Sequence, residues 1–163
     1  SCSATRSTSE SRSSARRGEA DEGSRMKFYI ATKLENHARH NDVRDRLAAL
    51  GHELTYDWTT HGPVWRSGVE VIQQTEAKER RGIEDADFII VLLPGGRGTH
   101  VELGYALALD KPVILWAADD SMFGATPETC AFYHHPNVRT IHGPLPIIAI
   151  PVLDLERAAE VPA

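Results

Sequence analysis

A glutamate beside a glycine-rich turn is the residue of this sequence best placed to do chemistry. Glu102 follows Gly95, Gly96 and Gly98, and residues 87–93 before the turn form an apolar, β-branched run long enough for one buried strand. Glycines let the backbone turn tightly and approach a ligand closely. Because ligands bind at the carboxyl ends of strands in an open parallel sheet, this carboxylate is predicted to lie where nucleophilic chemistry can occur.

The same spacing also fits a purely structural role for Glu102. Residues 103–110 are apolar all round, as in a packed helix, and Thr99 is a natural N-cap for it. In the capping box, a glutamate three positions after the cap closes back on the cap amide and only stabilises the helix start. The spacing alone leaves both interpretations of Glu102 open.

The elements that would position this glutamate alternate between strands and helices. Apolar runs and turn residues predict strands, helices and loops in the order strand 27–32, helix 36–50, strand 52–56, loop 57–67, helix 69–83, strand 87–93, helix 103–110, strand 111–116, irregular 117–137, and a last strand or extended segment at 147–153. This alternation predicts an α/β fold, a Rossmann-like or flavodoxin-like three-layer sandwich around a parallel sheet.

Three further groups of side chains are predicted to gather near Glu102. Tyr29 lies in the first strand, Asp57 and Trp58 follow the second, and Glu79 lies in the helix before the third. Strands one and three are neighbours in the flavodoxin-like order, so their carboxyl ends would bring these groups into one cleft. Core packing for Tyr29, a loop anchor for Trp58 and a solvated helix face for Glu79 are the alternatives.

Composition limits the classes of protein to which the chain can belong. It has 163 residues, 41% hydrophobic and 25% charged, with a net charge of −5, which predicts a single globular domain that does not bind nucleic acid. No stretch is apolar enough for a membrane span, and two cysteines form no disulfide framework, so we expect a cytoplasmic protein away from membranes.

The first 25 residues differ sharply in composition from the rest. They include eight serines and five arginines but no leucine, isoleucine, valine or aromatic residue, so they cannot bury a core. Acidic residues in this stretch argue against a transit peptide. We expect residues 1–25 to be a disordered or artificially added tail and residues 26–163 to be the folded domain.

Several well-known site motifs are not met. The turn at 95–98 lacks the Lys-Ser/Thr ending of a phosphate loop, and the full dinucleotide fingerprint is missing. The eight histidines show no zinc-type spacing, and no serine lies in a nucleophile elbow. We therefore expect neither a metal nor a cofactor, which leaves carboxylates and aromatic side chains to carry the chemistry.

Two stretches resemble a known enzyme family. Glu79-x-x-Gly82-Ile83-x-x-Ala86-Asp87, followed by Gly98-Thr99-x-x-Glu102-Leu103-Gly104-Tyr105-Ala106 and Lys111-Pro112-Val113, is similar to the nucleoside 2-deoxyribosyltransferases and their nucleotide N-glycosidase relatives. The likeness runs from about residue 27 to residue 137. The resemblance implies that Glu102 is the nucleophile, that Tyr29 orients it, and that Glu79, an aspartate in the family, interacts with the nucleobase.

The resemblance also implies a substrate site. Transferases complete the sugar site with an asparagine or nearby polar group of a neighbouring subunit, which implies a homo-oligomer and points to Asn137. In the glycine turn, Arg97 replaces an expected acidic residue and, with the amides that follow, suits a phosphate better than a hydroxyl. The expected substrate-binding residues are Asp57, Trp58, Gly96, Arg97, Gly98, Thr99, His100 and Asn137.

The expected activity is cleavage or exchange of the N-glycosidic bond of a (deoxy)nucleoside or nucleotide. A carboxylate attacks the anomeric carbon, the base departs, and a glycosyl-enzyme ester then passes the sugar to a second base or to water. Two other classes stay open at this stage. One is a non-catalytic nucleotide-binding or sensor domain, and the other is an NAD-type N-glycosidase.

Overall fold

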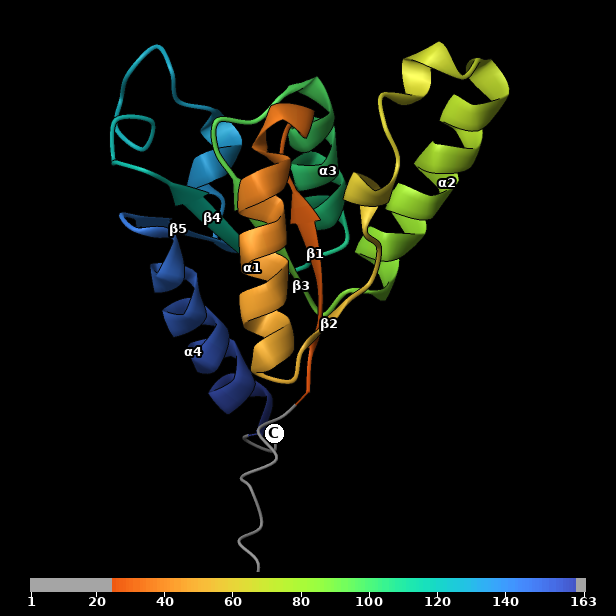
Figure 1. Cartoon of the computed structure of the whole chain (residues 1–163). Helices are drawn as coiled ribbons and strands as arrows, with labels where there is room; N and C mark the ends of the chain where they lie inside the picture. Colours follow the sequence, from red (N-terminus) through yellow and green to blue (C-terminus); the bar gives the residue numbers. More distant parts are fainter. Residues whose placement is uncertain (1–24, 161–163) are drawn as a thin grey trace, which may run out of the picture.

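A computed structural model of the chain describes residues 25–160, and the tail predicted for residues 1–25 lies, except for Arg25, outside the described residues. Five parallel strands form one sheet in the order β2-β1-β3-β4-β5. The strands are β1 (Lys27–Ala31), β2 (Glu53–Leu54), β3 (Phe88–Leu92), β4 (Val113–Ala117) and β5 (Val138–His142). The predicted α/β sandwich is confirmed, with strands one and three as neighbours (Figure 1).

Residues 25–160 also form four helices and five short 3-10 turns, of which one helix and one 3-10 turn follow the last strand. The helices are α1 (His37–Ala49), α2 (Val69–Asp85), α3 (Arg97–Ala108) and α4 (Ala149–Glu160), and the 3-10 turns are η1 (Leu34–Asn36), η2 (Trp58–Thr60), η3 (Val64–Arg66), η4 (Ala131–His134) and η5 (Leu145–Ile148). Within residues 25–160, no helix is both long and apolar enough to cross a membrane.

Alternation along the central strands divides the core into two layers. In β1 and β3, Phe28 and Phe88 face one side of the sheet, whereas their neighbours Tyr29 and Ile89 face the other. Residues of α1 and α4 complete the first layer, and residues of α2 and α3 complete the second. Tyr29 therefore points towards the same side of the sheet as the helix that carries Glu102.

The C-terminal part of the chain differs from the prediction. Residues 147–153 were expected to be extended, but they lie in η5 and α4, and the fifth strand is β5. Ile148, Val152 and Leu155 recur at helical spacing and contact the α1 side of the core. β5 was missed because it is an edge strand whose residues all remain partly or largely exposed, so it lacks an apolar run.

Candidate active site

The central contact of the site joins the first strand to the third helix. The Tyr29 hydroxyl donates a hydrogen bond to Oε1 of Glu102 at 2.5 Å. Tyr29 is fully buried in β1, whereas the Glu102 side chain remains partly accessible in the second turn of α3. A hydroxyl fixed by the core thus holds one carboxylate oxygen and leaves the other unoccupied by any described donor.

Burial controls the ionisation of this pair. It raises the pKa of Glu102 to about 8, the charge of Glu79 adds to the rise, and the hydrogen bond from Tyr29 acts in the opposite direction. Burial, followed by the neighbouring Glu102 carboxylate, also raises the pKa of Tyr29, so its proton stays on the phenol. Desolvation is therefore the dominant influence on the pKa of Glu102 in the free protein.

The start of α3 rules out the capping interpretation of Glu102. The helix begins at Arg97, six residues before the predicted start, and its N-cap is Gly96, three residues before the predicted cap Thr99. Thr99 lies inside the first turn, where its hydroxyl accepts a hydrogen bond from the Gly96 amide at 3.0 Å. Thr99 closes the helix start, and Glu102 is free for another role. A side chain on Gly95 would lie 2.7 Å from the Thr99 methyl group, so this turn requires glycine.

A cleft of about 500 Å³ opens beside Glu102 at the carboxyl ends of β1 and β3. Four segments line it: the residues after β1, the loop after β2, the middle of α2 and the start of α3. Seven of the predicted site residues lie in its wall, namely Trp58, Glu79, Gly96, Arg97, Gly98, Thr99 and Glu102.

The sequence prediction missed other residues of the wall. They are Thr32, Lys33, Leu34, His61, Gly62, Pro63, Val64 and Trp65. Thr32 and Lys33 directly follow the first strand, so the rule that placed Glu102 at a strand end could have identified them as well. Leu34 begins η1, and residues 61–65 belong to the loop after β2, whose course no periodicity reveals.

Glu79 and His61 form the ionisable wall opposite the glycine turn. Burial raises the pKa of Glu79, the charge of His61 acts against that rise, and Glu76 reinforces it. His61 is oriented by a hydrogen bond of 2.9 Å between its Nε2 and the Tyr56 hydroxyl. Glu79 and His61 thus both line the cleft that contains Glu102.

Two predicted site residues have structural partners instead. The Asp57 carboxylate accepts hydrogen bonds from Arg44 at 2.7 Å and from the Thr59 amide at 3.0 Å, and so caps η2. Although burial alone would raise it, these hydrogen bonds hold the pKa of Asp57 below its usual value. Asp57 does not line the cleft but supports the turn that carries Trp58.

His100 likewise lies behind the cleft rather than in its wall. Its Nδ1 lies 2.7 Å from the Gly96 carbonyl oxygen, and its Nε2 lies 2.8 Å from the Tyr133 hydroxyl. The imidazole therefore ties the glycine turn to η4. The prediction of a direct substrate contact is not supported by this position.

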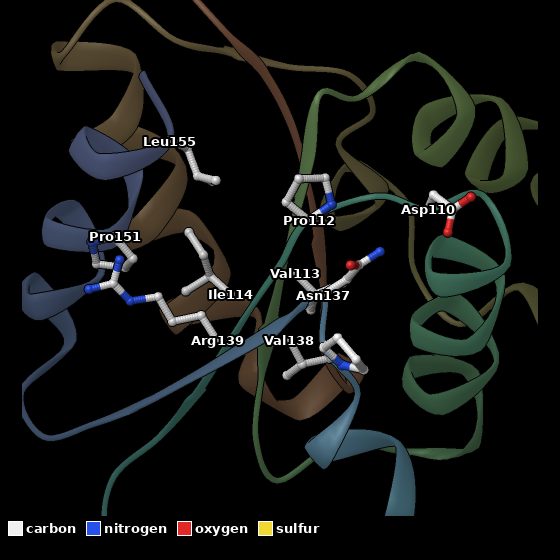
Figure 2. Close-up of a pocket in the computed structure, with 10 residues that line it drawn as sticks. Asp110, Pro112, Val113, Ile114, Asn137, Val138, Arg139, Pro151 and Leu155 are labelled. Atoms are coloured by element: carbon white, nitrogen blue, oxygen red, sulfur yellow. The ribbon is translucent and has the colours of Figure 1, made fainter. Parts of the chain in front are cut away.

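Asn137 lies at the opposite end of the sheet. It lines a separate pocket of about 270 Å³ at the amino ends of β4 and β5, together with Asp110, Pro112 and Arg139 (Figure 2). Within one chain it is thus remote from Glu102, which stands beside the carboxyl ends of β1 and β3. If Asn137 contributes to the site, it must be the Asn137 of a neighbouring subunit.

A second opening, which we call the α2–α3 pocket, reaches the same pair of carboxylates. It has a volume of about 270 Å³ and is lined by Glu76, Glu79, Arg80, Ile83, Val101, Glu102 and Tyr105. Glu79 and Glu102 also line the cleft, so both are accessible from two sides. Val101 at the rim is 70% exposed, a large value for an apolar side chain next to a buried carboxylate.

Two residues of the signature motifs have architectural roles. The Lys111 ammonium donates hydrogen bonds to the carbonyl oxygens of Glu84 and Ala86 at 2.7 and 2.6 Å, and so caps the end of α2. A side chain on Gly82 would lie 3.0 Å from the Tyr29 ring and 2.9 Å from Cβ of Tyr56. Gly82 therefore lets both tyrosines pack against α2.

The chain is similar to known proteins in its sequence profile and in its fold. The family profile described as nucleoside 2-deoxyribosyltransferase matches residues 28–135, which is more than half of the chain. Among solved structures, the CMP N-glycosidase BcmB of Clostridium botulinum superposes with a TM-score of 0.54 at 23% identity, covering 79% of this chain and 98% of that one. No curated protein sequence matches the chain significantly.

Proposed function

This chain belongs to the nucleoside 2-deoxyribosyltransferase family, whose enzymes act on small-molecule nucleosides or nucleotides, and we propose that it cleaves or exchanges an N-glycosidic bond with Glu102 as nucleophile. The observation that carries the proposal is the 2.5 Å hydrogen bond from Tyr29 to Glu102 at the edge of the cleft. It fixes one carboxylate oxygen and leaves the other available for attack.

The proposed reaction has two displacement steps. In the first, the free oxygen of ionised Glu102 bonds to the anomeric carbon while the carbon–nitrogen bond breaks, its electron pair going to the base. In the second, water or another base attacks the same carbon and releases the carboxylate. Tyr29 stabilises the charge that returns to Glu102, which is why a hydroxyl buried in β1 is the appropriate partner.

Glu79 is the proposed contact to the nucleobase. Its carboxyl lines both the cleft and the α2–α3 pocket, next to Glu102, and burial raises its pKa. A raised pKa favours the protonated carboxyl, which can donate a hydrogen bond or a proton to a ring nitrogen as the base departs. Glu79 is one methylene longer than the aspartate of the family, so in this role it would contact a base that lies farther from α2.

A nucleotide is the proposed substrate in preference to a nucleoside. Lys33 and Arg97 both line the cleft, and neither pairs with a carboxylate within residues 25–160. Arg97 also stands at the first position of α3, where amide groups and the helix dipole favour an anion. Two cations and a helix start together match a 5′-phosphate.

We also propose that the chain self-associates and that a second copy covers the α2–α3 pocket. An opening beside a catalytic carboxylate with a 70% exposed valine at its rim is suited to an apolar partner surface. Light scattering at micromolar concentration tests this directly. A strictly monomeric protein with full activity would remove both the oligomer and Asn137 from the proposed site.

One assay tests the activity and separates it from the alternatives. The protein is incubated with a deoxynucleoside plus a free base, with a nucleoside 5′-monophosphate, and with NAD, and released or exchanged bases are separated by chromatography. Base release from the monophosphate, absent in Glu102→Gln, is the expected result. Release from NAD alone would assign an NAD-type N-glycosidase. Binding without any release would leave a sensor domain.

A further inference from the structure

Trp65 differs from the other two tryptophans of the chain in its exposure. Its side chain is 67% exposed, whereas Trp58 and Trp116 are 7% and 3% exposed. The indole nitrogens of Trp58 and Trp116 donate to the carbonyl oxygens of Ile30 and Gly143. Within the described residues Trp65 has no such acceptor, so neither burial nor a hydrogen bond explains why a tryptophan occupies this position.

The position of Trp65 gives the indole a defined setting. It lies in η3, which follows Pro63 and ends before Gly68, and it lines the cleft that contains Glu102. The guanidinium carbon of Arg66 lies 4.7 Å from the centre of the indole ring. One face of the ring is thus covered by a cation, which holds the side chain in place and leaves the other face for a ligand.

We propose that Trp65 is the stacking platform for the nucleobase, with Arg66 as its support on the opposite face. This inference rests on the proposed function, because it assumes that the cleft takes a nucleoside or nucleotide. Every base has a flat aromatic face, so stacking on an exposed indole favours the binding of any base. The apolar neighbours Pro63 and Val64, and Leu34 from the segment after β1, complete an apolar lining for a ring.

This assignment orients the substrate in the cleft. The loop residues from His61 to Trp65 would face the base, the start of α3 with Arg97 would face the 5′ end, and Glu102 lies in the wall they share. His61, held by Tyr56, supplies a polar group at the base end. The part of the cleft that faces the base thus combines the flat indole of Trp65 with the polar imidazole of His61. A flat apolar surface with a precisely placed polar group is what a site needs to discriminate among bases.

The test uses Glu102→Gln as background, so that the ligand stays intact. Trp fluorescence is followed while AMP or CMP is added, with ribose 5-phosphate as a base-free probe. We expect AMP or CMP to quench the exposed indole and ribose 5-phosphate not to. Trp65→Ala should remove the quenching and weaken nucleotide binding about five- to a hundred-fold, while Trp65→Phe retains most of the affinity.

A matched control comes from another exposed aromatic residue. Phe132 is 56% exposed and lies outside the cleft, so Phe132→Ala should leave nucleotide affinity unchanged. Trp65 is largely in solvent, so its removal should cost little stability, which thermal unfolding checks.

The outcomes separate this inference from the proposed function. If the parent cleaves nucleotides but Trp65→Ala binds them equally well without loss of quenching, the stacking platform is wrong and the enzyme assignment stands. If nucleotides quench through Trp65 but nothing is cleaved, the platform stands and the enzyme assignment fails. Loss of self-association in Trp65→Ala with unchanged nucleotide affinity would make Trp65 an interface residue and overturn the inference.

Discussion

The Tyr29 hydroxyl and the Glu102 carboxylate, 73 positions apart in the sequence, meet in a hydrogen bond of 2.5 Å. Tyr29 lies in a strand buried on both faces, so its position is set by the core and not by the ligand. A carboxylate held in this way needs no reorganisation when a substrate arrives.

Replacing Tyr29 by phenylalanine should preserve the fold and reduce the rate. Losing a hydrogen bond to a charged group costs about 1.5–3 kcal/mol, which corresponds to roughly ten- to a hundred-fold in rate. The hydrogen bond also lowers the pKa of Glu102, so its loss should move the rising limb of the pH–rate profile above about 8. A reduced rate with an unshifted limb would mean that Tyr29 acts only through packing.

Glu102→Gln should abolish base release while leaving the protein at least as stable as the parent. A neutral amide is a poor nucleophile. Burial raises the pKa of Glu102 to about 8, so the folded state favours the protonated form and ionisation opposes folding as the pH rises from about 4.3 towards 8. At neutral pH the variant should therefore be more stable than the parent, by at most about 1.4 kcal/mol for each pH unit above about 4.3. Thermal unfolding and chromatography test both halves, and a variant that turns over like the parent would remove Glu102 as nucleophile.

Gly82→Ala should impair activity from a distance. The added Cβ would lie 3.0 Å from the Tyr29 ring and 2.9 Å from Cβ of Tyr56, so the rings or α2 must shift. We expect a loss of about 1–3 kcal/mol in stability from overpacking and a fall in kcat larger than the rise in KM. Gly104→Ala is the matched control, because no atom lies within 4 Å of its added Cβ. Equal activity of the two variants would show that the tyrosines have room to move.

Arg97→Ala should separate nucleotides from nucleosides. If its guanidinium binds the 5′-phosphate, KM for the monophosphate should rise roughly ten- to a hundred-fold, as expected for a charge-assisted hydrogen bond of about 1.5–3 kcal/mol. Turnover of the corresponding nucleoside should be unchanged. Lys33→Ala should act in the same direction. Steady-state kinetics with the monophosphate and with the nucleoside tests this prediction. An equal rise in KM for both substrates would mean that Arg97 does not bind the phosphate.

Acid should weaken the fold through His40. This side chain is fully buried against Trp58, and burial lowers the pKa of its imidazole, so the folded state resists protonation. The unfolded chain takes up the proton below about pH 6.5, so stability present above that pH is lost at up to about 1.4 kcal/mol per pH unit as the pH falls. His40→Phe should reduce this dependence in thermal unfolding. Exposed His37→Gln should behave like the parent.

The elements nearest the site were predictable because each has a strong local signal. The apolar run of β3, the glycines after it and the repeated spacing in α2 predicted the central elements and the region around Glu102. The resemblance to the family then linked Tyr29 to Glu102, a contact that no periodicity could reveal. β5 was missed because an exposed edge strand lacks an apolar run. α4 was missed although its apolar residues recur at helical spacing, and it carries Pro151 in its first turn.

Loop residues escaped prediction for a different reason. His61 and Trp65 enter the cleft through η2 and η3, whose course depends on the capping of η2 by Asp57 and on the tertiary contact between Asp57 and Arg44. Asp57 and His100 were assigned to the substrate because polar residues after a strand favour that interpretation. In the fold their hydrogen-bonding capacity is taken up by Arg44, Thr59, Gly96 and Tyr133.

The α2–α3 pocket bears on how long a sugar would stay attached to Glu102. An ester that solvent reaches from two sides would be hydrolysed more readily than an ester exposed on one side only, which would leave more time for a second base to enter. In the proposed mechanism, the partition between glycosidase and transferase is therefore decided at the outer rim, by whatever covers Val101 and Tyr105. Under this proposal, the same carboxylate would release bases in an isolated chain and exchange them in an assembled one.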